Sequence, residues 1–600
     1  MTRHTAGLGI RVDGRVLPTA CDLALVWAHV REDAHASATA EVGFRDPYQA
    51  ALLTETGISL GSTLRLTAFT PDGWHDLFVG EVTDCETRAV AESGRSVGQA
   101  GGLTVVRAQD LSHRLRRGTR TYAYHQMSAG QIVQKVADLA GVTVGTVDDP
   151  GPVYDFLTQP AMSDWEFLTH LARESGCDLF FRDGKLQFCE RARVSDAPAL
   201  GTSARQSPFA LEFGENLVKV SSVVSLHDQV AGIEVRGWDP QGKEALATLE
   251  APASGPARET AWQTGLGVVR GEPLLLAGQP RASQNEVDHV ARAMVQEVSA
   301  ALTRLRAVVR GEPRLRLRSA VALTGLGPQF EGRYTVTSVF HEYHPESGYL
   351  SELTVHEGTD RAVVGRPGSG EAGLRRFHGL VPGKVVDIQD ELGQGRVRVQ
   401  LPWLSADYVS NWARTVQSGG SRGHGVVLPE VGDEVLVGFE QGCLDRPYVL
   451  GGLYNGVDIP AAHSLDLVDG GKGVANRRSF GSKEGHRLEL LDAGSPGMGA
   501  TLVTGDGKLQ IRLDQHNTII SVQSDGTIEI SASHGITVDA GNAPLEFKGQ
   551  KVSVSAQQSI ELGAPTIDVK ASGQLNAWGM TAKFAADTLA ELSAALVRIN

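Results

Sequence analysis

The chain has 600 residues, of which 41% are hydrophobic, so we expect several domains with substantial cores. Its formal net charge of −14 argues against nucleic-acid binding as the main role, because that role needs a basic surface. The five cysteines stand singly, which argues against a disulfide framework or a CxxC zinc cluster. We see no signal-peptide core and no run of 18 apolar residues, so we expect neither Sec export nor a membrane-spanning helix.

Residues 1–370 are predicted to be mainly strands, with a few helices. An Asp-Gly pair inside residues 8–17 predicts a hairpin, since it lies between two alternating runs. Ser163–Glu166 and Ser283–Glu286 have the spacing of capping boxes, which begin helices. Helices with an apolar stripe are expected over 128–141, 163–176 and 283–302.

Residues 376–456 carry short, closely spaced apolar runs, the pattern of a small barrel such as an OB-fold. The expected strands are GKVVDI, GRVRVQLPW, HGVVLP, DEVLVGFE and PYVLGGLY. Pro402 and Pro429 end strands, and Gly432 makes a turn before the alternating Val435, Val437 and Phe439. Trp403 and Trp412 are expected to supply barrel core or interface area.

From about residue 500 the chain becomes a ladder of very short runs that start roughly eight residues apart. These runs are KLQIRL, NTIISVQ, TIEISA, GITVDA, PLEFKG, KVSVSA, SIELGA and TIDVKA. Apolar residues alternate with polar ones in each run, so each strand is expected to bury one face. We expect the buried core of the ladder to include Ile528, Ile530, Val552, Val554, Ile560, Ile567 and Val569.

The repeat length of the ladder favours three intertwined chains. A single-chain β-helix needs about 20 residues for each three-sided rung, and eight residues supply only one side. Three copies can supply one face each and pair every strand edge, which gives a trimeric β-prism. A flat β-meander and a single-chain solenoid are the alternatives. The final segment, TLAELSAALVRIN, has helical composition, but we favour a strand that continues the ladder.

The chain resembles the VgrG family of spike proteins and phage tail needle proteins. The motifs that carry the resemblance are GRVRV, LPW, WAR, LPEVGDEVLVGFEQG and RPYVLGGLYNG, which stand in this order within 378–456. Residues 154–181 and 331–344 are similar to that family's hub, and 480–492 to the entry of its needle. The resemblance implies a mainly β chain with four parts. These are a hub of paired β-barrels with helical insert (1–370), an OB-fold collar (376–456), a linker (457–479) and a trimeric β-prism needle (480–600).

The same resemblance implies a structural spike of a contractile injection machine rather than an enzyme. The implied partners are two further copies of the chain, inner tube and baseplate proteins, a PAAR-like tip cap, effector cargo and, transiently, a target membrane. We expect the cap to bind at Leu596, Val597, Ile599 and Asn600. Assembly is expected in the cytoplasm, with later release or delivery outside the cell. A type VI secretion system, an extracellular particle and a phage-like tail all stay open.

No catalytic or cofactor site is expected. The 20-odd residues of the linker are too few for an inserted enzyme, and the sequence given runs only to VRIN, so we expect no fused toxin. The alternative function is a trimeric tailspike-like depolymerase, which would need an acidic cleft. Glu529, Asp539 and Asp568 are instead expected to stand singly and to point outward.

No metal site is expected either. His341, Glu342 and His344 lack the spacing of a helical zinc motif, and in a strand His341 and Glu342 point to opposite faces, so a structural role is favoured. The last rungs of the ladder hold no histidine, the final one being His534. Asp164 and Glu166 are explained by the start of a helix rather than by acid–base chemistry.

Overall fold

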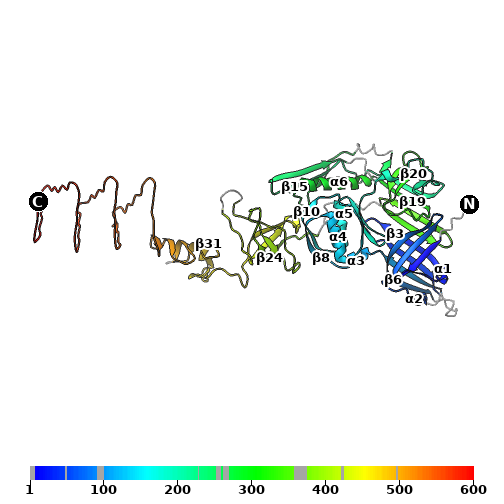
Figure 1. Cartoon of the computed structure of the whole chain (residues 1–600), viewed down its shortest axis with the longest axis horizontal. Helices are drawn as coiled ribbons and strands as arrows, with labels where there is room; N and C mark the ends of the chain where they lie inside the picture. Colours follow the sequence, from blue (N-terminus) through cyan, green and yellow to red (C-terminus); the bar gives the residue numbers. More distant parts are fainter. Residues whose placement is uncertain are drawn as a thin grey trace. The chain divides into compact units, whose positions relative to one another are not determined.

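The computed structural model describes residues 7–46, 51–90, 101–227, 229–251, 258–260, 269–356, 375–419, 425–494 and 497–599. The chain is mainly β with few helices, and it divides into two compact units, Met1–Ala461 and Ala462–Asn600 (Figure 1). Among the described residues no helix is both long and apolar enough to cross a membrane.

An eleven-stranded sheet is the framework of the N-terminal region, residues 7–356. In spatial order its strands are β14 (Leu217–Val224), β19 (Thr303–Arg310), β23 (Gly348–Val355), β22 (Ser338–His344), β3 (Leu25–Asp33), β4 (Thr39–Arg45), β7 (Gly101–Gln109), β6 (Gly73–Val90), β5 (Thr63–Thr70), β1 (Leu8–Val12) and β2 (Arg15–Val16). The β22–β3 pair joins strands from the two ends of this region. One hydrophobic core lies on the β3 side, and a second lies on the β22 side. One continuous sheet therefore connects the two cores, and the paired barrels stay a prediction.

The predicted Asp-Gly hairpin is confirmed, because β1 and β2 pair across Asp13 and Gly14, whose φ angles are 49° and 79°. Three main helices lie where the apolar stripes placed them, and three short helices were not predicted. The six are α1 (Thr19–Ala24), α2 (Ala51–Thr56), α3 (Ser112–Arg116), α4 (Ala129–Ala140), α5 (Asp164–Glu174) and α6 (Gln284–Ala300). The Ser163–Glu166 capping box is confirmed. At α6 the Ser283 hydroxyl caps Glu286 N–H, but the Glu286 carboxylate accepts from Ala282 N–H instead of Ser283 N–H.

Four smaller sheets complete the N-terminal region. They are β10 (Val153–Met162) with β8 (Arg120–Ser128), then β11 (Cys177–Arg182), β12 (Lys185–Glu190) and β9 (Val144–Val147), then β13 (Ala210–Glu212), β20 (Ala320–Thr324), β21 (Gly332–Thr335) and β17 (Arg258–Thr260), and β16 (Glu244–Glu250), β15 (Ile233–Asp239) and β18 (Leu274–Leu276). Helix α6 packs its buried valines against the β15–β16 hairpin. The first unit therefore holds several separate cores, as its length predicts.

The OB domain (residues 376–456) is a five-stranded sheet in the order β25 (Arg398–Gln400), β24 (Leu380–Asp387), β27 (Glu434–Phe439), β28 (Pro447–Gly452) and β26 (Arg414–Thr415). The predicted strand HGVVLP is wrong. Residues 425–430 pair with no strand, and Val426 and Val427 are exposed. The fifth strand of the sheet is instead β26, which begins at the arginine of the WAR motif and pairs with β28.

The second unit begins with the hairpin β29 (Val468–Asp469) and β30 (Val474–Ala475). An antiparallel meander follows, with β31 (Arg477–Gly481), β32 (Arg487–Asp492), β33 (Met498–Val503), β34 (Leu509–Asp514) and β35 (Ile519–Ser524). The first two runs of the ladder are thus strands of a meander that starts earlier, at Arg477. Over residues 477–524 the chain therefore forms the flat β-meander that the sequence analysis names as an alternative.

Residues 525–599 form neither helix nor strand within the chain (Figure 1, orange to red). The helical alternative for the final segment is not formed, and neither is a single-chain solenoid. The strands expected from TIEISA onward have no partner in their own chain. A strand needs a neighbouring strand to satisfy its backbone N–H and C=O groups. The single chain supplies no such neighbour for these runs.

Candidate functional site

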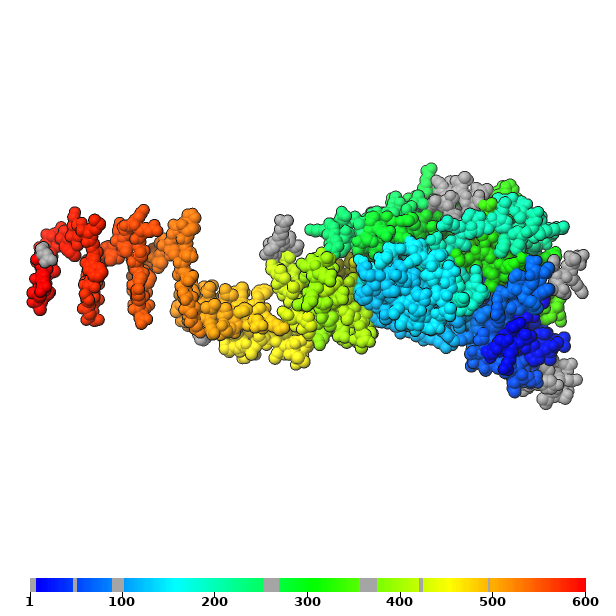
Figure 2. Space-filling view, viewed as in Figure 1, coloured from blue at the N-terminus to red at the C-terminus, as the bar shows by residue number. Residues whose placement is uncertain are grey.

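The apolar face of the ladder is the most unusual surface of the molecule. The seven residues expected to form its buried core are between 52% and 77% exposed in the single chain. They are Ile528, Ile530, Val552, Val554, Ile560, Ile567 and Val569. Figure 2 shows the segment uncovered on the face drawn, in orange to red.

This exposure is costly in water. Burying one Val, Leu or Ile side chain is worth about 1.5–3 kcal/mol, and a row of them spaced regularly along 40 residues adds up to a strong drive for burial. Soluble proteins rarely leave a contiguous apolar face of this size uncovered unless another molecule covers it. The ladder is therefore a candidate interaction surface.

The end of the ladder holds the residues expected to seat a cap. Leu596, Val597 and Ile599 are 70%, 47% and 88% exposed, so their apolar groups are open to a partner. Asn600 lies outside the described residues. The structure does not test whether a cap binds here.

The four OB residues singled out in the sequence lie at its surface or in its loops. The core is made of other residues, including Val385, Val399, Val435 and Val437. Trp403 is 45% exposed and donates from Nε1 to the Pro382 carbonyl at 3.1 Å. Trp412 lies under two guanidinium groups, those of Arg398 and Arg396, 4.7 and 5.6 Å from its ring centre.

Neither indole is among the buried residues of the barrel core, so interface area stays the prediction for Trp403 and Trp412. Gly432 turns the chain with a φ of 104°, as the Gly-Asp pair predicts, and Pro429 precedes that turn. These two residues shape the loop before β27 and contribute no chemistry.

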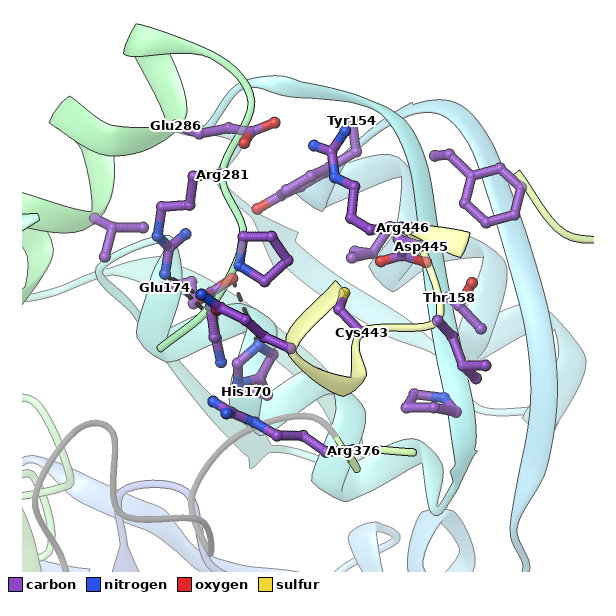
Figure 3. A pocket seen from close by; sticks show the side chains of 18 of the residues that line it. Tyr154, Thr158, His170, Glu174, Arg281, Glu286, Arg376, Cys443, Asp445 and Arg446 are labelled. Atoms are coloured by element: carbon purple, nitrogen blue, oxygen red, sulfur yellow. Dashed lines mark hydrogen bonds and ion pairs between the residues drawn. The ribbon is translucent and has the colours of Figure 1, made fainter. Parts of the chain in front are cut away.

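A small pocket lies where the OB domain meets the N-terminal region (Figure 3). Its centre is an ion network on α5, in which Glu174 contacts Arg281 Nη2 at 3.0 Å and His170 Nε2 at 3.5 Å. Burial alone would raise the pKa of Glu174, but His170 and Arg281 outweigh it and hold that pKa well below its usual range. Thr158 Oγ1 and Tyr408 Oη also bond across this junction, at 3.1 Å.

The pocket does not have the properties of an active site. Its volume is about 100 Å³, enough for a few water molecules. Burial raises the pKa of Cys443 to about 12, so the thiolate that a nucleophile needs is scarce at neutral pH. Burial likewise raises the pKa of Asp445 to about 7. The Glu174 network joins α5 to the segment before α6 within the N-terminal region, and the Thr158–Tyr408 bond joins that region to the OB domain.

His341 and His344, both on β22, lie in two different environments, as the alternation of side chains along a strand predicts. His341 is buried, and its Nδ1 lies 2.9 Å from Ser351 Oγ and 2.8 Å from Tyr349 Oη. Glu342 and His344 point to the other face of the sheet, where they meet His29 of β3. The sequence reasoning missed His29, because nothing local to it signals a partner so far along the chain.

Two protein-family models match the chain. A model described as the type VI secretion system/phage-baseplate injector OB domain matches residues 381–454. A model described as the Alg8 N-terminal domain matches residues 90–345, and no feature of the structure accounts for that match.

Among curated proteins, similarity is found to spike proteins of type VI secretion systems. VgrG5 of Pseudomonas aeruginosa is 47% identical over 66 residues, which are 10% of this chain and 8% of that protein. VgrG3 of Vibrio cholerae is 33% identical over 139 residues, 21% of this chain and 13% of that protein. VgrG1b of P. aeruginosa is 24% identical over 199 residues, 32% of this chain and 24% of that protein. The matched part thus spans a quarter or less of each relative.

Solved structures with a similar course of the chain include one from Escherichia coli and one from Francisella. An Escherichia coli component of the type VI secretion system aligns at 15% identity with a TM-score of 0.46, over 74% of this chain and 99% of that one. The PdpA–VgrG complex of Francisella aligns at 9% identity with a TM-score of 0.49, over 87% and 88%. The OB-domain match and the three curated relatives, each named as a VgrG spike protein, show that the chain is similar to VgrG spike proteins over the residues they match.

Proposed function

We propose that the chain is a structural spike of a contractile injection machine and that it works as a homotrimer. The observation that carries the proposal is the ladder, whose apolar face and strand edges have no partner in one chain. Two further copies would cover both at once. The curated relatives, all named as spike proteins, support the same role.

In this proposal the parts of the chain divide the work. The hub (1–370) docks on the inner tube and baseplate. The collar (376–456) and linker (457–479) connect the hub to the needle (480–600), which forms the β-prism. A prism with every edge paired is stiff and has no free strand to aggregate. Sheath contraction would drive it through the target envelope without any catalytic step.

The tip and the cargo belong to the same proposal. The exposed Leu596, Val597 and Ile599 would form, three times over, an apolar platform for a PAAR-like cap. A VgrG of Francisella has been solved in complex with PdpA, which supports protein partners on spikes of this kind. We propose assembly in the cytoplasm, followed by release or delivery with the particle.

Light scattering on the purified full chain tests the trimer. The expected mass is three times the 63.8 kDa of one chain. Val552→Asp places a charge on the face that the proposal buries and should dissociate the trimer or shift its mass toward the monomer. Ser553→Asp is the matched control, since the same charge one residue later points to the opposite face, and it should leave the mass unchanged.

A monomeric wild-type chain, or equal behaviour of the two variants, would contradict the proposal. Cleavage of a glycan by the isolated protein would instead favour the depolymerase alternative.

A further inference from the structure

His29, Glu342 and His344 form a cluster on the outer face of the eleven-stranded sheet. In the antiparallel pairing of β3 with β22, His29 stands directly opposite Glu342. His344 follows two residues after Glu342 and therefore points to the same face. The ligand atoms of all three side chains lie within 4.8 Å of one another.

The hydrogen bonding of the cluster is incomplete. His344 Nδ1 lies 3.3 Å from the Val26 carbonyl, which can only accept, so the proton of a neutral His344 is on Nδ1. Its Nε2 is then a lone pair, yet it lies 2.9 Å from Glu342 Oε1, a second acceptor. His29 Nε2 is buried, lies 3.7 Å from the same oxygen, and has no hydrogen-bond partner among the described residues.

A cation bound between the His29 and His344 nitrogens and the Glu342 carboxylate would satisfy these atoms together. Two imidazole nitrogens and one carboxylate are a common donor set for Zn²⁺. In a tetrahedral zinc site with bonds near 2.0–2.1 Å, the ligand atoms stand about 3.3 Å apart. The separations of 2.9 and 3.7 Å lie on either side of that value.

The surroundings favour a bound ion. Phe340 and Trp27 flank the His29 ring, with ring centres 5.3 and 6.1 Å away, and so limit its rotation. The three side chains are 27–39% exposed, which leaves a fourth position for water.

We propose that His29, Glu342 and His344 bind one divalent transition-metal ion, with Zn²⁺ as the best match. The site would lie on the β3–β22 pair, the seam that joins the two cores of the N-terminal region. The ion would act as a clip across this seam, between strands that are far apart in the sequence. The proposal stands on the N-terminal region alone and does not depend on the trimer.

Metal titration of the full chain tests the site. The protein is stripped with a chelator and titrated with Zn²⁺ against a chromophoric competitor, and Co²⁺ is added separately to read the coordination from its visible absorption. One ion per chain is expected, with His29→Ala and His344→Ala each weakening binding by at least about tenfold. His75→Ala is the control, because His75 lies on β6 of the same sheet, 3.0 Å from Thr70 of β5, and belongs to no such cluster among the described residues.

A second readout is the melting temperature, since a ligand of the native state raises it. Zn²⁺ should raise the melting temperature of the wild type and of His75→Ala but not of the His29→Ala variant. Circular dichroism verifies that each variant is folded. Failure to saturate at one ion per chain, or equal affinity in the wild type and a His29→Ala/His344→Ala double variant, would overturn the proposal and leave a His344–Glu342 ion pair.

Discussion

A buried ion pair between Glu32 and Arg316 ties the two sides of the N-terminal region together at the level of single residues. Arg316 Nε donates to Glu32 at 2.8 Å, and Leu317 N–H donates to the same carboxylate at 3.1 Å. Burial alone would raise the pKa of Glu32, but the Arg316 charge and these hydrogen bonds lower it overall. The pair is stabilising only while it is complete, since either charge alone would be buried without a partner.

Arg316→Ala should therefore lower the free energy of unfolding by about 3–5 kcal/mol, measured by denaturant titration. The lowered pKa of Glu32 also predicts a pH dependence. Its contribution is fully present above its ordinary pKa of 4.5 and is lost as the pH falls below that value through the folded pKa.

Arg236→Ala is the control for this prediction, because its pair with Glu234 is largely exposed. Its loss should be less than about 1 kcal/mol. Equal losses in the two variants would contradict the role given to the buried pair.

At the level of elements, helix α5 begins at a capping box that can be tested directly. The Ser163 hydroxyl accepts from Glu166 N–H at 3.3 Å, and the Glu166 carboxylate accepts from Ser163 N–H at 3.0 Å. Ser163→Ala removes the first of these bonds and should cost about 1 kcal/mol of stability in urea unfolding. Glu166→Gln keeps an acceptor and should cost less. A Ser163→Ala protein as stable as the wild type would show that the cap contributes nothing.

The elements that could be predicted from the sequence are those specified locally. The Ser163 cap and the Asp13-Gly14 turn lie within a few residues of what they control, so the sequence shows them directly. The run HGVVLP has the composition of a strand, but a strand also needs a neighbour, and residues 425–430 pair with none. His29 was missed for the same reason, since only the register of β3 against β22 brings it to Glu342.

At the level of the whole molecule, the chain has separate cores that must be held together and a ladder that lacks strand partners. Within the first unit, the β3–β22 seam and the Glu174 network hold separate cores together. In the proposed needle, the joining partners of the ladder would be further copies of the chain. The period of eight residues predicts three copies, but one chain alone does not contain that pairing.

Hydrogen exchange of the backbone amides in residues 525–599 tests the central proposal most directly. These amides have almost no hydrogen bonds within the chain, so protection can come only from other copies. We expect protection comparable to that of β27, the buried central strand of the OB domain. Exchange of these residues as fast as an unstructured peptide, in protein whose β27 is protected, would contradict the trimeric needle.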